Sequence, residues 1–227
     1  GAAAAPAREG GRAWAVLAGP LTAMLVAAIA SSAIVTFLAI PLDRVPWVAA
    51  LALLGYGVLM VLGRWGAGML SDRHGRAVLL VPGMLSAGIG MALAAWAVWP
   101  AHVGWSGPEA AGATLIIAGA ALFGAGFGAV QNDTIVLMFH RAGPAGYGRA
   151  SAVWNISYDA GTGIGALVLG TTLRYLGYGW GFALTAAAVA ACLPVALALT
   201  GNGRAAAAGT PRRVRTTTRA RGRSGSG

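Results

Sequence analysis

The sequence of 227 residues contains no lysine, only six acidic residues and a single cysteine, Cys192. Charged residues make up 10% of the chain, whereas a soluble domain usually carries about 25%. This shortage of charge argues against a water-soluble globular protein. One cysteine cannot form a disulfide within the chain, which excludes a disulfide-stapled secreted fold. The absence of lysine also excludes the G-x-x-x-x-G-K-[ST] nucleotide loop of an ABC exporter that carries its ATPase in the same chain.

Hydrophobic residues and glycine are abundant instead. Hydrophobic residues make up 57% of the chain, there are 36 glycines, and the mean hydropathy is +0.70. Intrinsic disorder requires low hydrophobicity, so it is excluded for most of the length. The composition therefore indicates a polytopic membrane protein.

A membrane-spanning helix needs about 20 mostly apolar residues. None of the long apolar stretches alternates with a period of two, and a helix satisfies its backbone polar groups within lipid. The sequence predicts an all-α fold with six transmembrane helices, at 14–42, 46–70, 77–99, 113–139, 149–173 and 179–200. Residues 1–13 are expected to form a cytoplasmic linker and residues 201–227 a disordered, arginine-rich cytoplasmic tail.

The distribution of arginine predicts the orientation. All sixteen basic residues are arginines, and with the N-terminus inside only Arg44 and Arg174 fall on the outer side. Cytoplasmic loops carry an excess of Lys and Arg, so we expect a multi-pass protein of the cell membrane with both termini in the cytoplasm. For the tail we favour attraction to anionic lipids, or no role, over binding of nucleic acid.

A motif lies between the second and third predicted spans, where residues 68–76 read GMLSDRHGR. Its specified positions are Gly68, Asp72, Arg73, Gly75 and Arg76. Glycine lets two helices approach closely or permits a turn with positive φ, and the aspartate can pair with the arginines. This G-x-x-x-D-R-x-G-R pattern resembles the signature loop of the major facilitator superfamily. The resemblance implies that Asp72 faces a helix N-terminus in another bundle and that the cluster latches a cytoplasmic gate; the alternative is a solvated charged loop.

A second resemblance covers the fourth and fifth predicted spans. It is carried by Gly124, Gly126, Gly128, Gln131, Asn132 and Asp133, and then by residues 148–152, Asn155, Asp159, Gly161 and Gly165. These runs are similar to the tenth and eleventh helices of the drug and sugar efflux branch of the same superfamily. The resemblance implies that residues 14–200 are the C-terminal six-helix half, with a missing N-terminal six-helix bundle as partner. Gly1 then fits either a fragment or removal of the initiator Met.

Only two acidic residues, Asp133 and Asp159, lie within predicted spans. A charge at the bilayer centre costs about 2.5–3.5 kcal/mol on insertion scales, so such residues are functional candidates. Asp159 shares one helical face with Ser151, Asn155 and Thr162, and this stripe should face protein or water. We expect Asp159, Asn155, Gln131, Asn132 and Asp133 to contact substrate or protons. The alternatives are a buried acid used for packing at Asp159 and a polar cap beside a wet vestibule at Asp133.

Other features have simpler interpretations. Arg64 either snorkels to the inner interface or joins the gate cluster. The pairs Gly124–Gly128 and Gly161–Gly165 have G-x-x-x-G spacing, which is typical of helix packing in lipid.

The resemblance implies a secondary transporter that works by alternating access, and the function we expect is export of small organic molecules in exchange for protons. Protonation of a membrane carboxylate removes the cost of burying its charge, which lets the two bundles rock. The alternatives are a non-transporting membrane scaffold and a six-span membrane enzyme. An enzyme is disfavoured because His74, His102 and His140 fall in loops or at span ends, and we expect no metal and no cofactor. The expected partners are a small-molecule substrate, protons, the lipid bilayer and the missing bundle.

Overall fold

The computed structural model describes residues 5–99 and 110–208. In these residues the chain forms helices joined by turns, with no β-strand, which confirms the predicted all-α fold. The helices are α1 (Ala5–Ser32), α2 (Pro46–His74), α3 (Leu80–Ala97), α4 (Ala110–Ala142), α5 (Tyr147–Leu176), α6 (Tyr178–Ala191) and α7 (Leu193–Ala208). A π-helical turn (Ala33–Phe37) and a 3-10 turn (Ile40–Leu42) follow α1, and a 3-10 turn (Pro144–Gly146) precedes α5.

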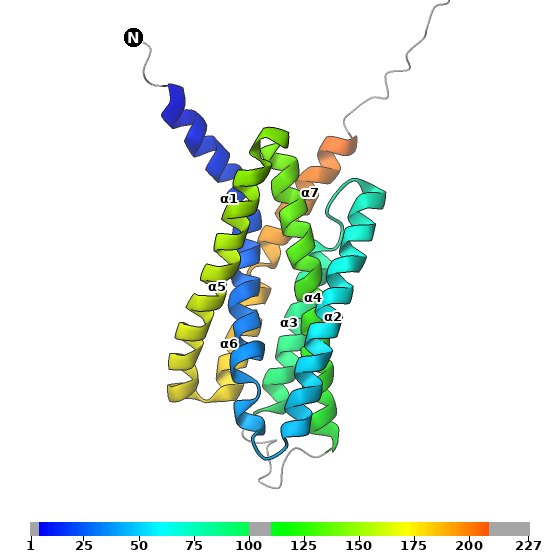
Figure 1. The fold of residues 1–227 in the computed structure, drawn as a ribbon, viewed down its shortest axis with the longest axis vertical. Coiled ribbons are helices and arrows are strands. Elements are labelled where there is room, and N and C mark those ends of the chain that lie inside the picture. Colours follow the sequence, from blue (N-terminus) through cyan, green and yellow to red (C-terminus); the bar gives the residue numbers. More distant parts are fainter. Residues whose placement is uncertain (1–4, 100–109, 209–227) are drawn as a thin grey trace, which may run out of the picture.

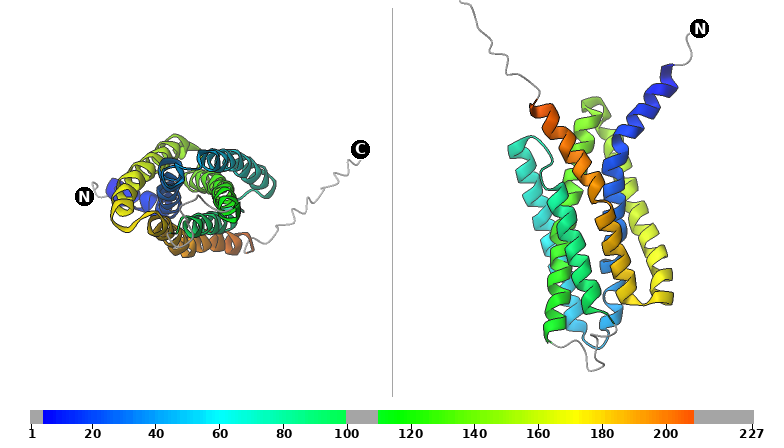
Figure 2. Two further views of the ribbon diagram at one scale, coloured as in Figure 1. Left: turned by 90° about the horizontal axis from the view of Figure 1, so that it is seen from below. Right: turned by 180° about the vertical axis from the view of Figure 1, so that it is seen from behind.

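The helices form one bundle with a common long axis (Figure 1). α4 packs against α2 and α3, α1 packs against α5, and α3 packs against α6. α5 and α2 flank α1 and α4 on the near side of the bundle in Figure 1, whereas α3, α6 and α7 lie on the side that the reverse view of Figure 2 brings forward. The bundle therefore has two distinct faces.

Five helical stretches in the described residues are long and apolar enough to cross a membrane, at Leu17–Leu42, Pro46–His74, Leu80–Ala97, Ala111–Ala142 and Tyr178–Gly201. They correspond to five of the six predicted spans. α5 is not among them, because polar residues such as Asn155 and Asp159 interrupt its apolar sequence. It is nevertheless 30 residues long and lies beside α1 for most of its length (Figure 1).

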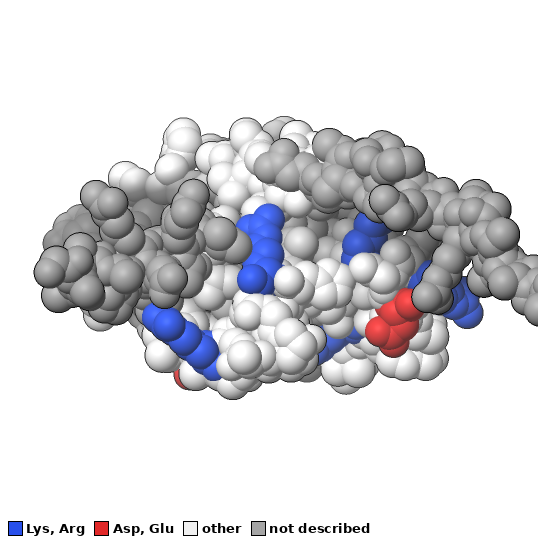
Figure 3. All heavy atoms as spheres, turned by 90° about the horizontal axis from the view of Figure 1, so that it is seen from above, with Lys and Arg blue, Asp and Glu red and all other residues white. Residues whose placement is uncertain are grey.

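Helices α1 to α6 alternate in direction and α7 continues the direction of α6, so the helix ends gather at two opposite ends of the bundle (Figure 1). The start of α1, the α2–α3 turn, the α4–α5 turn and the end of α7 lie at one end, which we call the arginine end (Figure 1). Seen from this end, arginine side chains are spread over the surface (Figure 3). Arg44, in the α1–α2 connection, and Arg174, in the last turn of α5, lie at the other end. The start of α1 and the end of α7 therefore lie at the same end of the bundle, as an even number of membrane crossings requires.

Several helix ends differ from the predicted span ends. α2 continues through Ser71 to His74, so most of the motif is helical rather than a loop. α1 begins at Ala5, inside the expected linker. Polar side chains after a hydrophobic run suggest a loop. A helix can nevertheless continue beyond the run, because water hydrogen-bonds the backbone groups that its last turns leave without a partner.

The sixth predicted span is divided into α6 and α7 at Cys192. Pro194 follows the break, and proline has no N–H to donate to the preceding turn. α7 then passes the expected end at Thr200 and continues to Ala208. The remainder of the expected tail, and residues 100–109 of the outer connection, lie outside the described residues.

Glycines on α4 and α5 allow backbones to meet, as the G-x-x-x-G spacing predicts. A Cβ added to Gly124 or Gly128 would collide with a backbone carbonyl of α2, that of Tyr56 or Met60 respectively. On α5, a Cβ at Gly161 would lie 2.8 Å from the backbone oxygen of Leu25 on α1, and Gly165 contacts the next turn of α1 in the same way. The predicted packing role of both pairs is confirmed, and α4 is held directly against the α2 backbone.

This geometry predicts that Gly128→Ala destabilises the fold. The added methyl has no space beside the Met60 carbonyl, and such overpacking typically costs about 1–3 kcal/mol. Gly57→Ala on α2 is the control, because nothing lies within 4 Å of its added Cβ. Thermal unfolding in detergent should show a lower midpoint for Gly128→Ala and no loss for Gly57→Ala. Equal midpoints for the two variants would contradict the close α2–α4 contact.

Candidate functional site

The motif ends α2 at the arginine end of the bundle. Gly75 follows the last helical residue with φ +64°, a conformation that glycine adopts without strain, so the predicted turn is confirmed. Gly68 does not mediate a close helix approach, however. A Cβ added there would lie 3.5 Å from the side-chain oxygen of Asn132, which is an ordinary contact. The close helix approach expected at Gly68 is therefore not found in the described residues.

The charged residues of the motif do not form the expected cluster of ion pairs. Asp72, Arg73 and Arg76 are all exposed, and in the described part of the chain none of them pairs with another. Figure 3 shows charged side chains spread over this end rather than gathered at one point. The three residues are available to partners outside the described residues, such as lipid or another bundle.

Asp133 on α4 is the buried acid at this end, with no exposed surface. Its Oδ2 accepts a hydrogen bond from the backbone N–H of Leu79 at 2.6 Å. Its Oδ1 accepts bonds from the hydroxyl of Ser71 and from the side-chain amide of Asn132, both at 3.2 Å. Asn132 also donates to the Ser71 hydroxyl at 3.3 Å. Every partner is supplied by the chain itself, so the carboxylate is buried without loss of hydrogen bonding.

This carboxylate caps a helix. Leu79 is the N-cap residue of α3, and its side chain cannot accept a hydrogen bond from the first amides of that helix. An anion near a helix N-terminus is favourable because the backbone N–H groups there point outward and carry partial positive charge. The family resemblance assigned such a role to Asp72 and a helix of another bundle. That prediction concerns a contact outside this chain. Within the chain, Asp133 contacts the start of α3 and ties α4 to the α2–α3 turn.

A second polar group lies between α2, α4 and α5. Arg64 of α2 donates through Nη1 to Oε1 of Gln131 at 3.2 Å, and its guanidinium carbon lies 5.8 Å from the ring centroid of Trp154. Trp154 in turn donates to the Thr134 hydroxyl at 3.0 Å. Arg64 therefore contacts α4 and α5, a pair of contacts that the sequence did not indicate.

Stacked aromatic rings form a row behind this group. The row crosses from α2 through α4 to α5, with neighbouring ring centroids 5.8–6.3 Å apart, and consists of Tyr56, Phe123, Phe127, Tyr158 and Trp154. Phe123 and Phe127 are fully buried. These ring contacts hold in position the Trp154 ring against which the Arg64 guanidinium lies.

The polar residues of α5 lie on its surface. Asp159 and Asn155 are exposed, and the Asn155 amide donates to the backbone oxygen of Ser151 at 2.9 Å. The Thr162 hydroxyl donates to the backbone oxygen of Tyr158 at 3.0 Å. Large apolar side chains of α5 are exposed around them, at Ile156, Ile164, Leu167 and Val168. No described residue covers the Asp159 carboxylate.

The predicted site residues thus divide into two groups. Asn132 and Asp133 belong to the buried cap, whereas Gln131, which contacts Arg64, and the exposed residues Asn155 and Asp159 of α5 lie outside it. The sequence did not indicate Ser71, Leu79 or Trp154 as partners. The hydroxyl of Ser71, one residue before the motif aspartate, could have suggested a hydrogen-bonding role. Nothing in the sequence marks the backbone amide of Leu79 or the ring of Trp154 as a partner.

No group of three or more His, Cys, Asp or Glu that could hold a metal ion occurs among the described residues. Scans of the chain against protein-family models, curated proteins and solved structures found no match. The function must therefore be inferred from the geometry.

Asp133 and Asp159 should differ sharply in their effect on stability. Asp133→Asn turns one of the two acceptor oxygens into an NH2 group that only donates, so the hydrogen bonds from Leu79 and from Asn132 cannot both be kept. Hydrogen bonds to charged groups contribute about 1.5–3 kcal/mol, so the free energy of unfolding should fall by that amount. Asp159→Asn, at an exposed position, should change it by less than about 0.5 kcal/mol. Chemical unfolding in detergent would measure both, and equal losses would show that the cap does not stabilise the fold.

Proposed function

We propose that the chain is one six-helix bundle of a secondary active transporter, in which α5 crosses the membrane together with the five apolar stretches. The G-x-x-x-D-R-x-G-R motif and the resemblance to the major facilitator superfamily support this proposal. The carrier exports small organic molecules in exchange for protons, and works by alternating access against an N-terminal bundle. The arginine end faces the cytoplasm of the cell membrane, as the excess of arginine there favours.

The exposed polar face of α5 carries the proposal. Asp159 is surrounded on the same helix by exposed apolar side chains such as Ile156 and Leu167, the latter 77% exposed. Lipid can cover those apolar groups but cannot hydrate a carboxylate. A helix with this surface needs water or another protein element on one side and tolerates lipid on the other. A water-filled cavity between two bundles provides both.

The residues near this face have the chemistry of a transport site. The Asp159 carboxylate makes no hydrogen bond with another described residue, so it is open to a transported molecule or proton from outside the bundle. Arg64 and Gln131 offer a cation and an amide between α2, α4 and α5, beside the flat ring of Trp154. Asp133 is less suited to carry protons, because both of its oxygens already accept hydrogen bonds from the chain.

A helix pair on the same side supports a second bundle as partner. α2 exposes a broad apolar surface that includes Leu54, Val61 and Trp65. α2 and α5 flank the near side of the bundle in Figure 1. A second bundle seated on that side would cover part of both helices and enclose the polar groups between them.

Transport by the carrier with both bundles tests this function. In proteoliposomes with an imposed proton gradient, Asp159→Asn should abolish gradient-driven movement of organic dyes but preserve dye exchange without a gradient. The neutral side chain mimics the protonated state and cannot cycle. Asp43→Asn is the control, because Asp43 is an exposed acid of the α1–α2 connection at the other end of the bundle.

Unchanged gradient-driven transport in Asp159→Asn would remove Asp159 from the coupling mechanism. Absence of any dye movement by the unaltered carrier, across a chemically broad panel, would instead favour the scaffold or the enzyme.

A further inference from the structure

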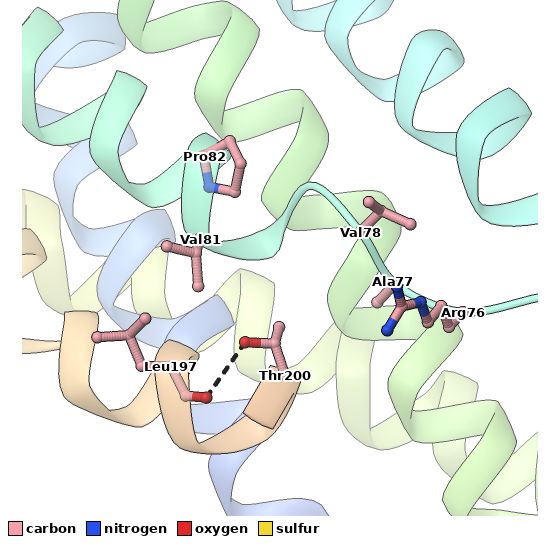
Figure 4. A pocket seen from close by; sticks show the side chains of 7 residues that line it. All are labelled: Arg76, Ala77, Val78, Val81, Pro82, Leu197 and Thr200. Carbon is pink, nitrogen blue, oxygen red and sulfur yellow. Dashed lines mark hydrogen bonds between the residues drawn. The ribbon is translucent and has the colours of Figure 1, made fainter. Parts of the chain in front are cut away.

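A pocket of about 230 Å³ opens between the start of α3 and α7. Figure 4 shows its lining side chains, which come from the α2–α3 turn, the first turn of α3 and one face of α7. They are Arg76, Ala77, Val78, Val81, Pro82, Leu197 and Thr200. A water molecule takes up about 30 Å³ of the liquid, so the pocket has room for a group of several heavy atoms.

The pocket is amphipathic. Val81, Pro82 and Leu197 give it an apolar wall. Arg76 supplies a guanidinium that makes no hydrogen bond or ion pair within the described part of the chain. The hydroxyl of Thr200 donates to the backbone oxygens of its own helix, at 3.1 Å to Ala196 and 3.2 Å to Leu197, so its oxygen remains able to accept a hydrogen bond.

The location of the pocket distinguishes it from the proposed transport site. It lies at the arginine end, on the side of α3 and α7, whereas the polar groups near Arg64 lie between α2, α4 and α5. A transported molecule held between two bundles would not reach it. A lipid at the membrane surface would, because the apolar wall belongs to helices that are apolar enough to span the bilayer.

We propose that this pocket binds the head group of an anionic phospholipid. A guanidinium binds phosphate through charge-assisted hydrogen bonds, often two at once. Basic pockets between transmembrane helices recognise anionic lipid head groups on this principle. Arg76 would hold the phosphate, and Thr200 would accept a hydrogen bond from a head-group hydroxyl. The part of an acyl chain nearest the head group would lie along Val81 and Leu197. The lipid would thereby bridge the motif and the last helix.

Lipid binding to the full chain in neutral detergent tests the proposal. Native mass spectrometry would count bound phosphatidylglycerol, with phosphatidylcholine and inorganic phosphate as comparison ligands. Arg76→Gln should weaken phosphatidylglycerol binding about fivefold to tenfold, since one arginine near an anionic surface contributes about 1 kcal/mol and its direct hydrogen bonds add to this. Arg73→Gln is the matched control. It removes the same charge from the same end of the bundle but does not line the pocket.

A second variant keeps the charge of Arg76 but fills the pocket with a larger side chain. Leu197→Trp should also weaken phosphatidylglycerol binding, while thermal unfolding in detergent shows whether the variant is folded. Equal weakening by Arg76→Gln and Arg73→Gln would overturn the proposal, because it would indicate general attraction to the basic end. Equal affinity for phosphatidylcholine, or an affinity for inorganic phosphate as high as for the lipid, would overturn it as well.

Discussion

The constraint on which this structure depends is that lipid offers no hydrogen-bonding partner to a polar group. A chain with this few charges can place them in only a few ways. Asp133 is buried and all of its hydrogen bonds come from the chain, so its charge is part of the fold. Asp159 is exposed and no described residue covers it, so its charge requires something outside the bundle. The same residue type thus serves stability at one site and, we infer, function at the other.

Close helix contacts make the buried cap possible. Gly124 and Gly128 bring α4 against the backbone of α2, and Gly126 brings it against α3. With α4 held between these helices, Asp133 reaches both the Ser71 hydroxyl on α2 and the Leu79 amide at the start of α3. The α2–α3 turn, and with it the motif, is therefore fixed to α4 by a charged group. Any movement of the motif at the arginine end must strain or break these hydrogen bonds.

Much of the fold could be predicted from the sequence because long apolar runs determine where helices lie. The helices, the turn at Gly75 and the packing role of the glycine pairs follow from local residue types. Contacts between distant residues could not be predicted in this way. The motif suggested that Asp72 meets a helix N-terminus of another bundle, which this chain does not test. The contact of Asp133 with the start of α3 depends on where α4 sits in space, and no local pattern indicated it. Arg64 was likewise ambiguous, because only the packed bundle shows that Gln131 and Trp154 lie within its reach.

The central claim is that one side of α5 faces water or protein while the adjacent side faces lipid. Water accessibility of two neighbouring positions tests it most directly. After replacement of the buried Cys192 by Ala, Asn155→Cys and Ile156→Cys place a thiol at nearly the same depth on two sides of the helix. A water-soluble maleimide, added to membrane fragments open on both sides, should label Asn155→Cys much faster than Ile156→Cys. Equal protection at both positions would mean that the polar side of α5 does not line a hydrated cavity, which would contradict the account.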